Sequence, residues 1–166
     1  MIRRFSLVIL VLIFAGAAFG ETEKAPEFRK AGVWINSSAL SLKSLRGKVV
    51  LVDFWAFDCE PCIDAMPHIR TLYSKYESRG LVVIGVHAPR TKDEKNLSKL
   101  REAVSRLDIR FPVVTDNEQK IWSDYRCDLW PTAFVIDRNG AIQYSRGGIG
   151  RYDELERKIL SLLESK

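Results

Sequence analysis

The sequence contains few of the residues that bind metals or form structural disulfides. Its 166 residues include three cysteines and two histidines, and none of them has the spacing of a set of metal ligands. Because three is an odd number, the cysteines cannot all pair within the chain. Hydrophobic residues make up 46% of the sequence, which is enough to bury a core without disulfides. We therefore expect no resident metal and no cofactor.

A strong excess of charge of one sign is also absent. The 26 lysines and arginines exceed the 21 acidic residues, for a net charge of +5 at pH 7, but the basic residues are scattered among the acids. This pattern does not form the basic patch that binds nucleic acids. Internal repeats and low-complexity segments are lacking as well. We expect a single globular domain that does not bind nucleic acid.

The longest largely apolar stretch, residues 5–19, is shorter than the roughly 20 residues of a membrane-spanning helix. It follows the basic start MIRR and ends in Ala18-Phe19-Gly20, the small-residue pattern at which export signals are cleaved. We predict that residues 1–20 are a signal peptide, with an uncleaved membrane anchor as the alternative. Residues 21–166 would then form the domain, exported to the periplasm or another extracytoplasmic compartment.

Beyond this segment, the hydrophobic pattern alternates between buried strands and amphipathic helices. Strands are predicted at residues 33–35, 40–42, 49–56, 81–86 and 111–115, and a hairpin at 132–136 and 141–144. Helices are predicted at residues 59–78, 93–107, 117–125 and from 151 onward. This order indicates an α/β domain, a central mixed sheet flanked by helices, with a short N-terminal strand extension.

Two of the three cysteines, Cys59 and Cys62, form a CxxC pair at the predicted start of the first long helix. A ring this small constrains the unfolded chain little, so the pair is a poor structural staple. The free N–H groups and the dipole of the helix N-terminus favour a thiolate at Cys59, and Pro61 fits the first turn. We predict that Cys59 is the nucleophile and that Cys62, one turn further, reaches back to it.

Asp53 interrupts the apolar run VVLVDFWA, which directly precedes the cysteine pair. A buried, unpaired carboxylate costs several kcal/mol, roughly, unless it is protonated or hydrogen-bonded. One interpretation is an aspartate whose hydrogen bonds to the backbone are purely structural. Its place on the strand that leads into the CxxC helix favours another, in which Asp53 exchanges a proton with Cys62.

Several motifs resemble those of the thioredoxin-like superfamily, from about Ala25 to the C-terminal helix. The longest are LRGKVVLVDFWAFDCEPC, FPVVTDN and WPTAFVIDRNG, which are similar to exported TlpA-like and ResA-like proteins. The motifs APEF, WINS, LSLKSLRGK, GVHAP and IWSDY are most similar to the DipZ-type branch. The resemblance implies a thioredoxin-like fold and a redox-active Cys59–Cys62 disulfide.

The resemblance also implies further site residues. Pro131 matches the proline that is cis in the family and faces the cysteine pair, and it would line the substrate groove with Trp130 beside it. Trp55 matches a tryptophan near the site, although a core aromatic is an equal interpretation. Glu60 and Pro61 lie between the cysteines and would border the same groove.

Other positions depart from the family pattern. Ala65 stands where reductases of cytochrome c maturation often carry a glutamate, although the letters CEPC occur in some of them. Asp58 replaces the aromatic residue before the first cysteine, and its charge opposes a thiolate unless it caps the helix. The strand at 81–86 has no lysine to pair with Asp53. We interpret Cys127 as a small hydrophobic residue and His87 as a structural or loop histidine.

Taken together, we expect an exported thiol–disulfide oxidoreductase, an enzyme that reduces disulfides of extracytoplasmic client proteins, with cytochrome c biogenesis as one such role. The resemblance implies a membrane thiol-transfer protein as electron donor, and we expect a monomer. A thiol peroxidase is an alternative, but Ala56 occupies the position of its usual threonine. A copper carrier would have a CxxxC spacing and a downstream histidine. The third alternative is a binding domain with an incidental disulfide.

Overall fold

A computed structural model describes residues 23–165. Its centre is a six-stranded sheet in the order β1-β4-β3-β2-β5-β6. Strands β2, β3 and β4 are parallel to one another, whereas β1, β5 and β6 each run antiparallel to their neighbours. The strands are β1 (Trp34–Ile35), β2 (Val49–Trp55), β3 (Leu81–His87), β4 (Val113–Thr115), β5 (Thr132–Ile136) and β6 (Ile142–Gly147).

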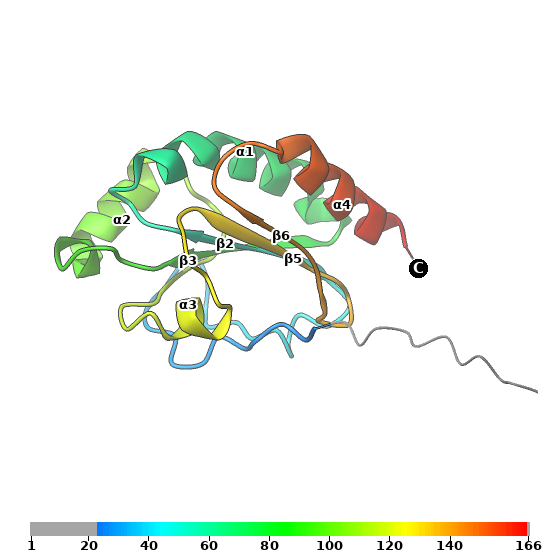
Figure 1. Ribbon diagram of the computed structural model, residues 1–166, viewed down its shortest axis with the longest axis horizontal. Coiled ribbons are helices and arrows are strands. Elements are labelled where there is room, and N and C mark those ends of the chain that lie inside the picture. Colours follow the sequence, from blue (N-terminus) through cyan, green and yellow to red (C-terminus); the bar gives the residue numbers. More distant parts are fainter. Residues whose placement is uncertain (1–22, 166) are drawn as a thin grey trace, which may run out of the picture.

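Helices cover both faces of this sheet (Figure 1). Three of them, α1, α2 and α4, lie on one face, and the short α3 lies on the other together with the N-terminal segment. The helices are α1 (Glu60–Tyr76), α2 (Leu97–Arg106), α3 (Lys120–Asp124) and α4 (Tyr152–Glu164), with 3-10 turns η1 (Glu77–Arg79) and η2 (Asp93–Lys95). The mixed α/β sheet flanked by helices is therefore confirmed.

Strand β2 is buried along its whole length because it lies at the centre of the sheet. Side chains of a strand alternate between the two faces. Val50, Val52 and Phe54 accordingly pack with α3 and the N-terminal segment, and Leu51 and Trp55 pack under α1 and α4. By the same alternation Asp53 points towards α1, the helix that carries the cysteines.

The prediction of a strand at residues 40–42 was wrong, because residues 40 and 41 have no regular structure and Leu42 begins a run of turns. The Glu27 carboxylate accepts hydrogen bonds from the backbone N–H groups of Leu42 and Lys43, each at 2.9 Å. Ser41 and Ser44 also exchange hydrogen bonds with each other's backbone. Side chains thus satisfy donors that a strand would have offered to a neighbour.

The predicted helix at 93–107 is divided in two. Residues 93–95 form η2, and α2 begins after Asn96, whose side-chain oxygen accepts a hydrogen bond from the Lys99 N–H group at 3.1 Å. Asparagine is a strong N-cap residue, so a new helix starts here.

The proposed signal peptide, residues 1–20, lies outside the described residues. Within residues 23–165, none of the helices is both long and apolar enough to cross a membrane.

Candidate active site

The two cysteines of the CxxC pair lie where β2 leads into α1, and they are joined by a disulfide. Cys59 is the N-cap residue of α1, and its backbone oxygen accepts hydrogen bonds from the N–H groups of Cys62 (2.9 Å) and Ile63 (3.0 Å). The Cα atoms of Cys59 and Cys62 are 5.2 Å apart. No side chain caps this helix end, so the positive end of the helix dipole lies next to Cys59, the N-cap residue. Asp58 therefore does not cap the helix.

The loop before β5 provides the second part of the site. The Trp130–Pro131 peptide bond is cis, as the family resemblance implied. The Trp130 indole donates a hydrogen bond to the Ala88 carbonyl at 3.0 Å and stacks on the Trp122 ring, with centroids 3.9 Å apart. These contacts hold the loop against the end of β3, next to the strand that leads into the cysteines.

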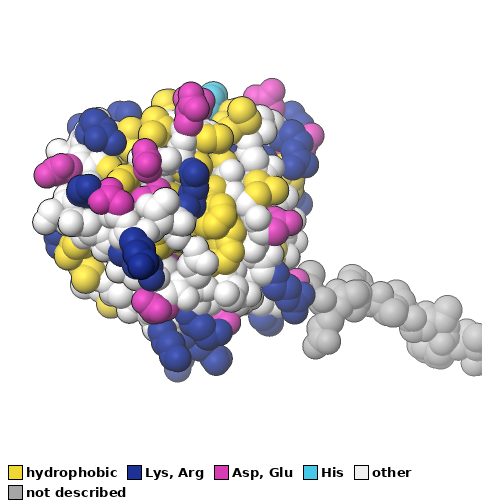
Figure 2. Space-filling view, turned by 60° about the vertical axis from the view of Figure 1, so that its left-hand side comes forward, with side chains coloured by type: hydrophobic (Ala, Val, Ile, Leu, Met, Phe, Trp, Pro, Cys, Tyr) yellow, Lys and Arg dark blue, Asp and Glu magenta, His cyan; other side chains and the backbone are white. Residues whose placement is uncertain are grey.

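Two loops that carry exposed hydrophobic side chains meet at this proline. The Gly148 N–H group donates to the Pro131 carbonyl at 2.7 Å, which ties the β6–α4 loop to the Pro131 loop. Leu129 and Ile149 are 41% and 58% exposed. Figure 2 shows one face of the molecule, on which hydrophobic side chains gather among charges of both signs. Glu60 and Pro61, between the cysteines, are also exposed. These two side chains and those of Leu129 and Ile149 are therefore accessible to a bound protein.

Asp53 is buried beneath this region, with small neighbours on both sides. Its partners in the adjacent strands are Gly85 of β3 and Ala133 of β5. The Asp53 side chain is almost completely buried, and its Oδ1 atom has no hydrogen-bond partner among the described residues. Burial raises the pKa of Asp53 to about 7, and the positive charge of Arg146 acts in the opposite direction. Near neutral pH this carboxyl group can therefore both donate and accept a proton.

Trp55 and His87 form a buried aromatic layer beside Asp53. Their rings meet edge to face with centroids 5.4 Å apart, and the Phe57 ring stacks on His87 at 5.4 Å. The Phe57 N–H group donates to His87 Nε2 at 3.4 Å. Burial lowers the pKa of His87 to about 4, so the ring is neutral. His87 thus supports the segment between β2 and Cys59, which fits the structural interpretation.

Glu94 is a residue of the site that the sequence did not indicate. Its buried carboxylate accepts hydrogen bonds from the backbone N–H groups of Asp58 (3.1 Å), Arg90 (2.5 Å) and Thr91 (3.1 Å). The Arg90 side chain in turn donates to the Asp58 carbonyl at 3.3 Å. Glu94 therefore ties the residue before Cys59 to the loop after β3. In the sequence it sits among charged neighbours, as a solvated residue would.

The third cysteine lies apart from this site. Cys127 is half-buried against the core on the α3 side of the sheet. Burial raises the pKa of its thiol to about 12, so the thiol stays protonated. Within residues 23–165, no group of three or more histidine, cysteine or acidic side chains is arranged to hold a metal ion.

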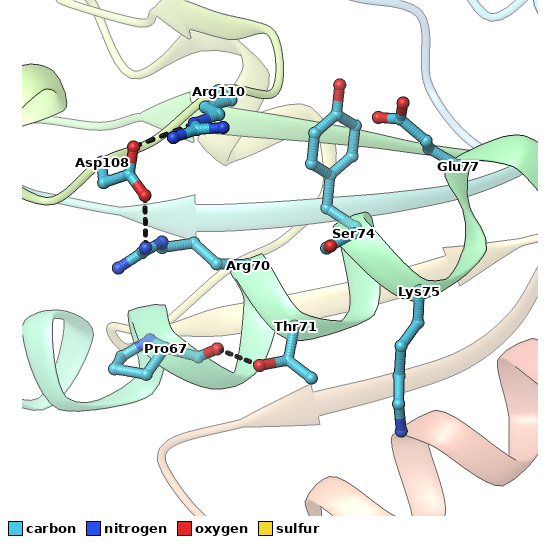
Figure 3. A pocket seen from close by; sticks show the side chains of 9 residues that line it. Pro67, Arg70, Thr71, Ser74, Lys75, Glu77, Asp108 and Arg110 are labelled. Atoms are coloured by element: carbon cyan, nitrogen blue, oxygen red, sulfur yellow. Dashed lines mark hydrogen bonds and ion pairs between the residues drawn. The ribbon is translucent and has the colours of Figure 1, made fainter.

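A groove of about 650 Å³ runs along α1, away from the cysteine pair (Figure 3). Arg70 of α1 and Arg110 both point towards Asp108, at 2.5 Å and 3.0 Å. The Thr71 hydroxyl donates to the Pro67 carbonyl at 2.8 Å. Arg70, Asp108 and Arg110 are thus paired with one another, and none of the residues that line the groove is a cysteine.

Comparison with known proteins gives a consistent result. Residues 22–145, which include both cysteines, Asp53 and Pro131, match the AhpC/TSA family. Protein DipZ of Mycobacterium tuberculosis (strain CDC 1551 / Oshkosh) is 38% identical over 142 residues, which are 84% of this chain and 20% of DipZ. The chain thus spans about one fifth of the length of the DipZ relatives that it matches.

Two further proteins are similar over most of their own length. Thiol-disulfide oxidoreductase ResA of Bacillus anthracis is 32% identical over 147 residues, covering 81% of this chain and 82% of ResA. The crystal structure of a putative thiol:disulfide interchange protein DsbE from Chlorobium tepidum is 28% identical, with a TM-score of 0.76. That match covers 86% of this chain and 96% of the other.

Proposed function

The chain belongs to the AhpC/TSA family of thioredoxin-like proteins, and on that premise we propose that it is a thiol–disulfide oxidoreductase that acts through Cys59 and Cys62. One observation carries the proposal: the two cysteines form a disulfide at an uncapped helix N-terminus. Relatives named as thiol-disulfide oxidoreductase and thiol:disulfide interchange protein support it.

The reaction starts from the reduced pair. The Cys59 thiolate attacks one sulfur of a client disulfide and forms a mixed disulfide, and the other client sulfur leaves as a thiolate. Cys62 then loses its proton to the Asp53 carboxylate and attacks the Cys59 sulfur, which releases the second client sulfur. The client disulfide has gained two electrons, and Cys59–Cys62 is left as the disulfide. The two client thiolates take up one proton that Cys62 lost through Asp53 and a second from solvent, to which Cys59 released its own proton when its thiolate formed. The raised pKa of Asp53 supports its role as proton acceptor.

The partners follow from the same chemistry. We propose that the protein is exported and reduces disulfides of extracytoplasmic clients, which bind over Trp130, Pro131 and the exposed residues Glu60 and Pro61. Each turnover consumes the two electrons of the thiol pair, so a donor must reduce it again. A membrane thiol-transfer protein, as the family resemblance implies, is the proposed donor.

Single cysteine substitutions test the function. In an insulin-reduction assay, Cys59→Ser is expected to lower the rate about 1,000-fold or more, because the nucleophile is lost. Cys62→Ser keeps the nucleophile but cannot resolve the intermediate, so it should accumulate a mixed disulfide that mass spectrometry identifies. Cys127→Ser, which removes the thiol outside the site, is the matched control and should retain activity. Full activity of Cys59→Ser would overturn the mechanism.

The alternative functions give different results with the same variants. A thiol peroxidase would consume hydrogen peroxide rapidly, and Cys62→Ser would still react with the first equivalent of peroxide. A copper carrier would bind copper with a fixed stoichiometry in a titration of the reduced protein. We expect slow peroxide consumption and no stoichiometric copper binding, because Cys59 and Cys62 serve disulfide exchange.

A further inference from the structure

We propose that Arg146 is a positioning residue for this chemistry: a buried cation on β6 that acts on the Asp53 carboxyl group from two strands away. The effect of Arg146 on the reaction rests on the proposed function, but the electrostatic coupling between Arg146 and Asp53 can be measured separately. It assigns a role to a buried charge that the mechanism does not otherwise use.

The register of the sheet brings the two residues onto one face. Asp53 of β2 is paired with Ala133 of β5, and Ala133 is paired with Arg146 of β6. Directly paired residues of neighbouring strands project to the same side of a sheet, so all three face α1 and α4. Two strand spacings separate the backbones of Asp53 and Arg146 by about 10 Å. In the sheet, Ala133 lies between them and its side chain is a single methyl group, which an arginine side chain is long enough to extend over.

Among residues 23–165, Arg146 forms no ion pair with an acidic side chain. Arg146 is 2% exposed, and arginine is rarely buried to this degree unless it is paired. Its contacts are a hydrogen bond from Nη1 to the Gly150 carbonyl and the Tyr152 ring, 4.7 Å from its guanidinium carbon. In residues 23–165 its Nε atom has no hydrogen-bond partner, and no ion pair includes it. Asp53 is the carboxyl group that the register places nearest.

Few other titratable groups face Asp53 from the elements packed around it. Helix α1 contributes Cys62, and β3 contributes His87, whose ring is neutral because burial lowers its pKa to about 4. On the α4 side, the Tyr152 ring lies over Arg146 and stacks on His68, with centroids 3.7 Å apart. Unlike Cys62, His87 and Tyr152, Arg146 carries a charge at every pH at which the protein is folded.

The effect on Asp53 follows from the sign of that charge. Burial favours the protonated carboxyl and raises its pKa, whereas the Arg146 charge favours the carboxylate and lowers it. Without Arg146, Asp53 would hold its proton to a higher pH. Since Cys62 gives its proton to the carboxylate, resolution of the mixed disulfide would then require a higher pH as well. Arg146 thus supplies from β6 the cation that β3 lacks.

Substitution of Arg146 in the full chain tests the coupling. In Arg146→Met, the pKa of Asp53, followed by the carbon chemical shift of its carboxyl group, is expected to rise by about one pH unit. A small aromatic disulfide can be used to form a mixed disulfide between Cys59 and an aromatic thiol. The pH at which Cys62 resolves this intermediate at half its maximal rate should rise by a similar amount. Arg146→Lys keeps the charge and should retain most of the wild-type profile. In an Asp53→Asn background, Arg146→Met should cause no further shift of the profile.

A second measurement needs no substitution of Arg146. The nitrogen chemical shift of Arg146 Nε in the wild-type protein should change with the same midpoint as the Asp53 titration, and this step should vanish in Asp53→Asn. An unchanged Asp53 pKa in Arg146→Met, or an Arg146 signal that does not follow Asp53, would overturn the proposal. If the proposed oxidoreductase function is wrong, the wild-type protein will not reduce insulin, but the coupling between the Asp53 and Arg146 signals will still be observed.

Discussion

At the scale of single residues, Asp53 is the position where stability and chemistry conflict. The strand buries its carboxyl group between Gly85 and Ala133, and the pKa of the folded state, about 7, lies well above the ordinary value of 3.8. In the unfolded chain the same group ionises near its ordinary pKa. The folded protein therefore retains a proton that the unfolded chain releases, and its stability depends on pH.

We expect Asp53→Asn to stabilise the oxidised protein at pH 8 by about 4 kcal/mol, since a shift of one pKa unit corresponds to about 1.4 kcal/mol. Below about pH 3 the carboxyl group is protonated in both states, so the gain should disappear. It should grow as the pH rises from about 4 to 7 and remain constant above that. Urea unfolding across this pH range measures it.

The control is Asp64→Asn, a substitution of an exposed aspartate on α1. It should change the free energy of unfolding by less than about 0.5 kcal/mol at either pH. A stability difference for Asp53→Asn that does not vary with pH would contradict the raised pKa.

At the scale of elements, the start of α1 depends on a residue from η2. Glu94 accepts three backbone hydrogen bonds and so connects the segment before Cys59 to the loop after β3. A buried N–H group that loses its acceptor costs about 1–3 kcal/mol. The geometry of the cysteine pair is therefore maintained partly from outside its own helix.

Glu94→Ala is expected to destabilise the protein by about 2–4 kcal/mol and to speed amide hydrogen exchange at Asp58, Arg90 and Thr91. Glu94→Gln retains one acceptor oxygen and should show a smaller change. Asp93→Ala removes a neighbouring exposed carboxylate that pairs with Lys99 and should cost less than about 1 kcal/mol. Wild-type exchange at Asp58 in Glu94→Ala would show that the contact is not needed.

At the scale of the whole molecule, two hydrophobic cores on opposite faces of the sheet leave little apolar surface exposed. Among residues 23–165, the large hydrophobic side chains that are exposed are Val33, Leu129 and Ile149. A specific interface buries about 800 Å² on each partner, which three separate side chains do not provide. Two of them lie in the loops that meet at Pro131, where we propose that clients bind.

We therefore expect residues 21–166 to be monomeric at micromolar concentrations, and sedimentation equilibrium measures this directly. Ile149→Ser should leave the mass unchanged and weaken client binding, seen as a higher KM for a protein disulfide. A stable dimer that Ile149→Ser dissociates would mean that these loops form a subunit interface instead.

Local patterns in the sequence were sufficient to predict the α/β fold, the helix that begins at the cysteines and the burial of Asp53. Each of these depends on residues close together in the chain: the alternation of strands and helices, the CxxC spacing and a charge within an apolar run. The family resemblance added the cis peptide bond at Pro131. Besides the helix at 93–107, which is divided at Asn96, the segment at 40–42 differed from the prediction, because Glu27, a residue outside the pattern, accepts hydrogen bonds from its backbone.

The tertiary structure alone decided which distant residues act on the site. Glu94 and Arg146 are 35 and 87 positions beyond Cys59 in the sequence, where each looks like an ordinary surface charge. The loop after β3 brings Glu94 to Asp58, and the strand register brings Arg146 onto the face of Asp53. Such contacts depend on how strands pair and helices pack across the whole chain, and a local sequence pattern does not determine that long-range pairing.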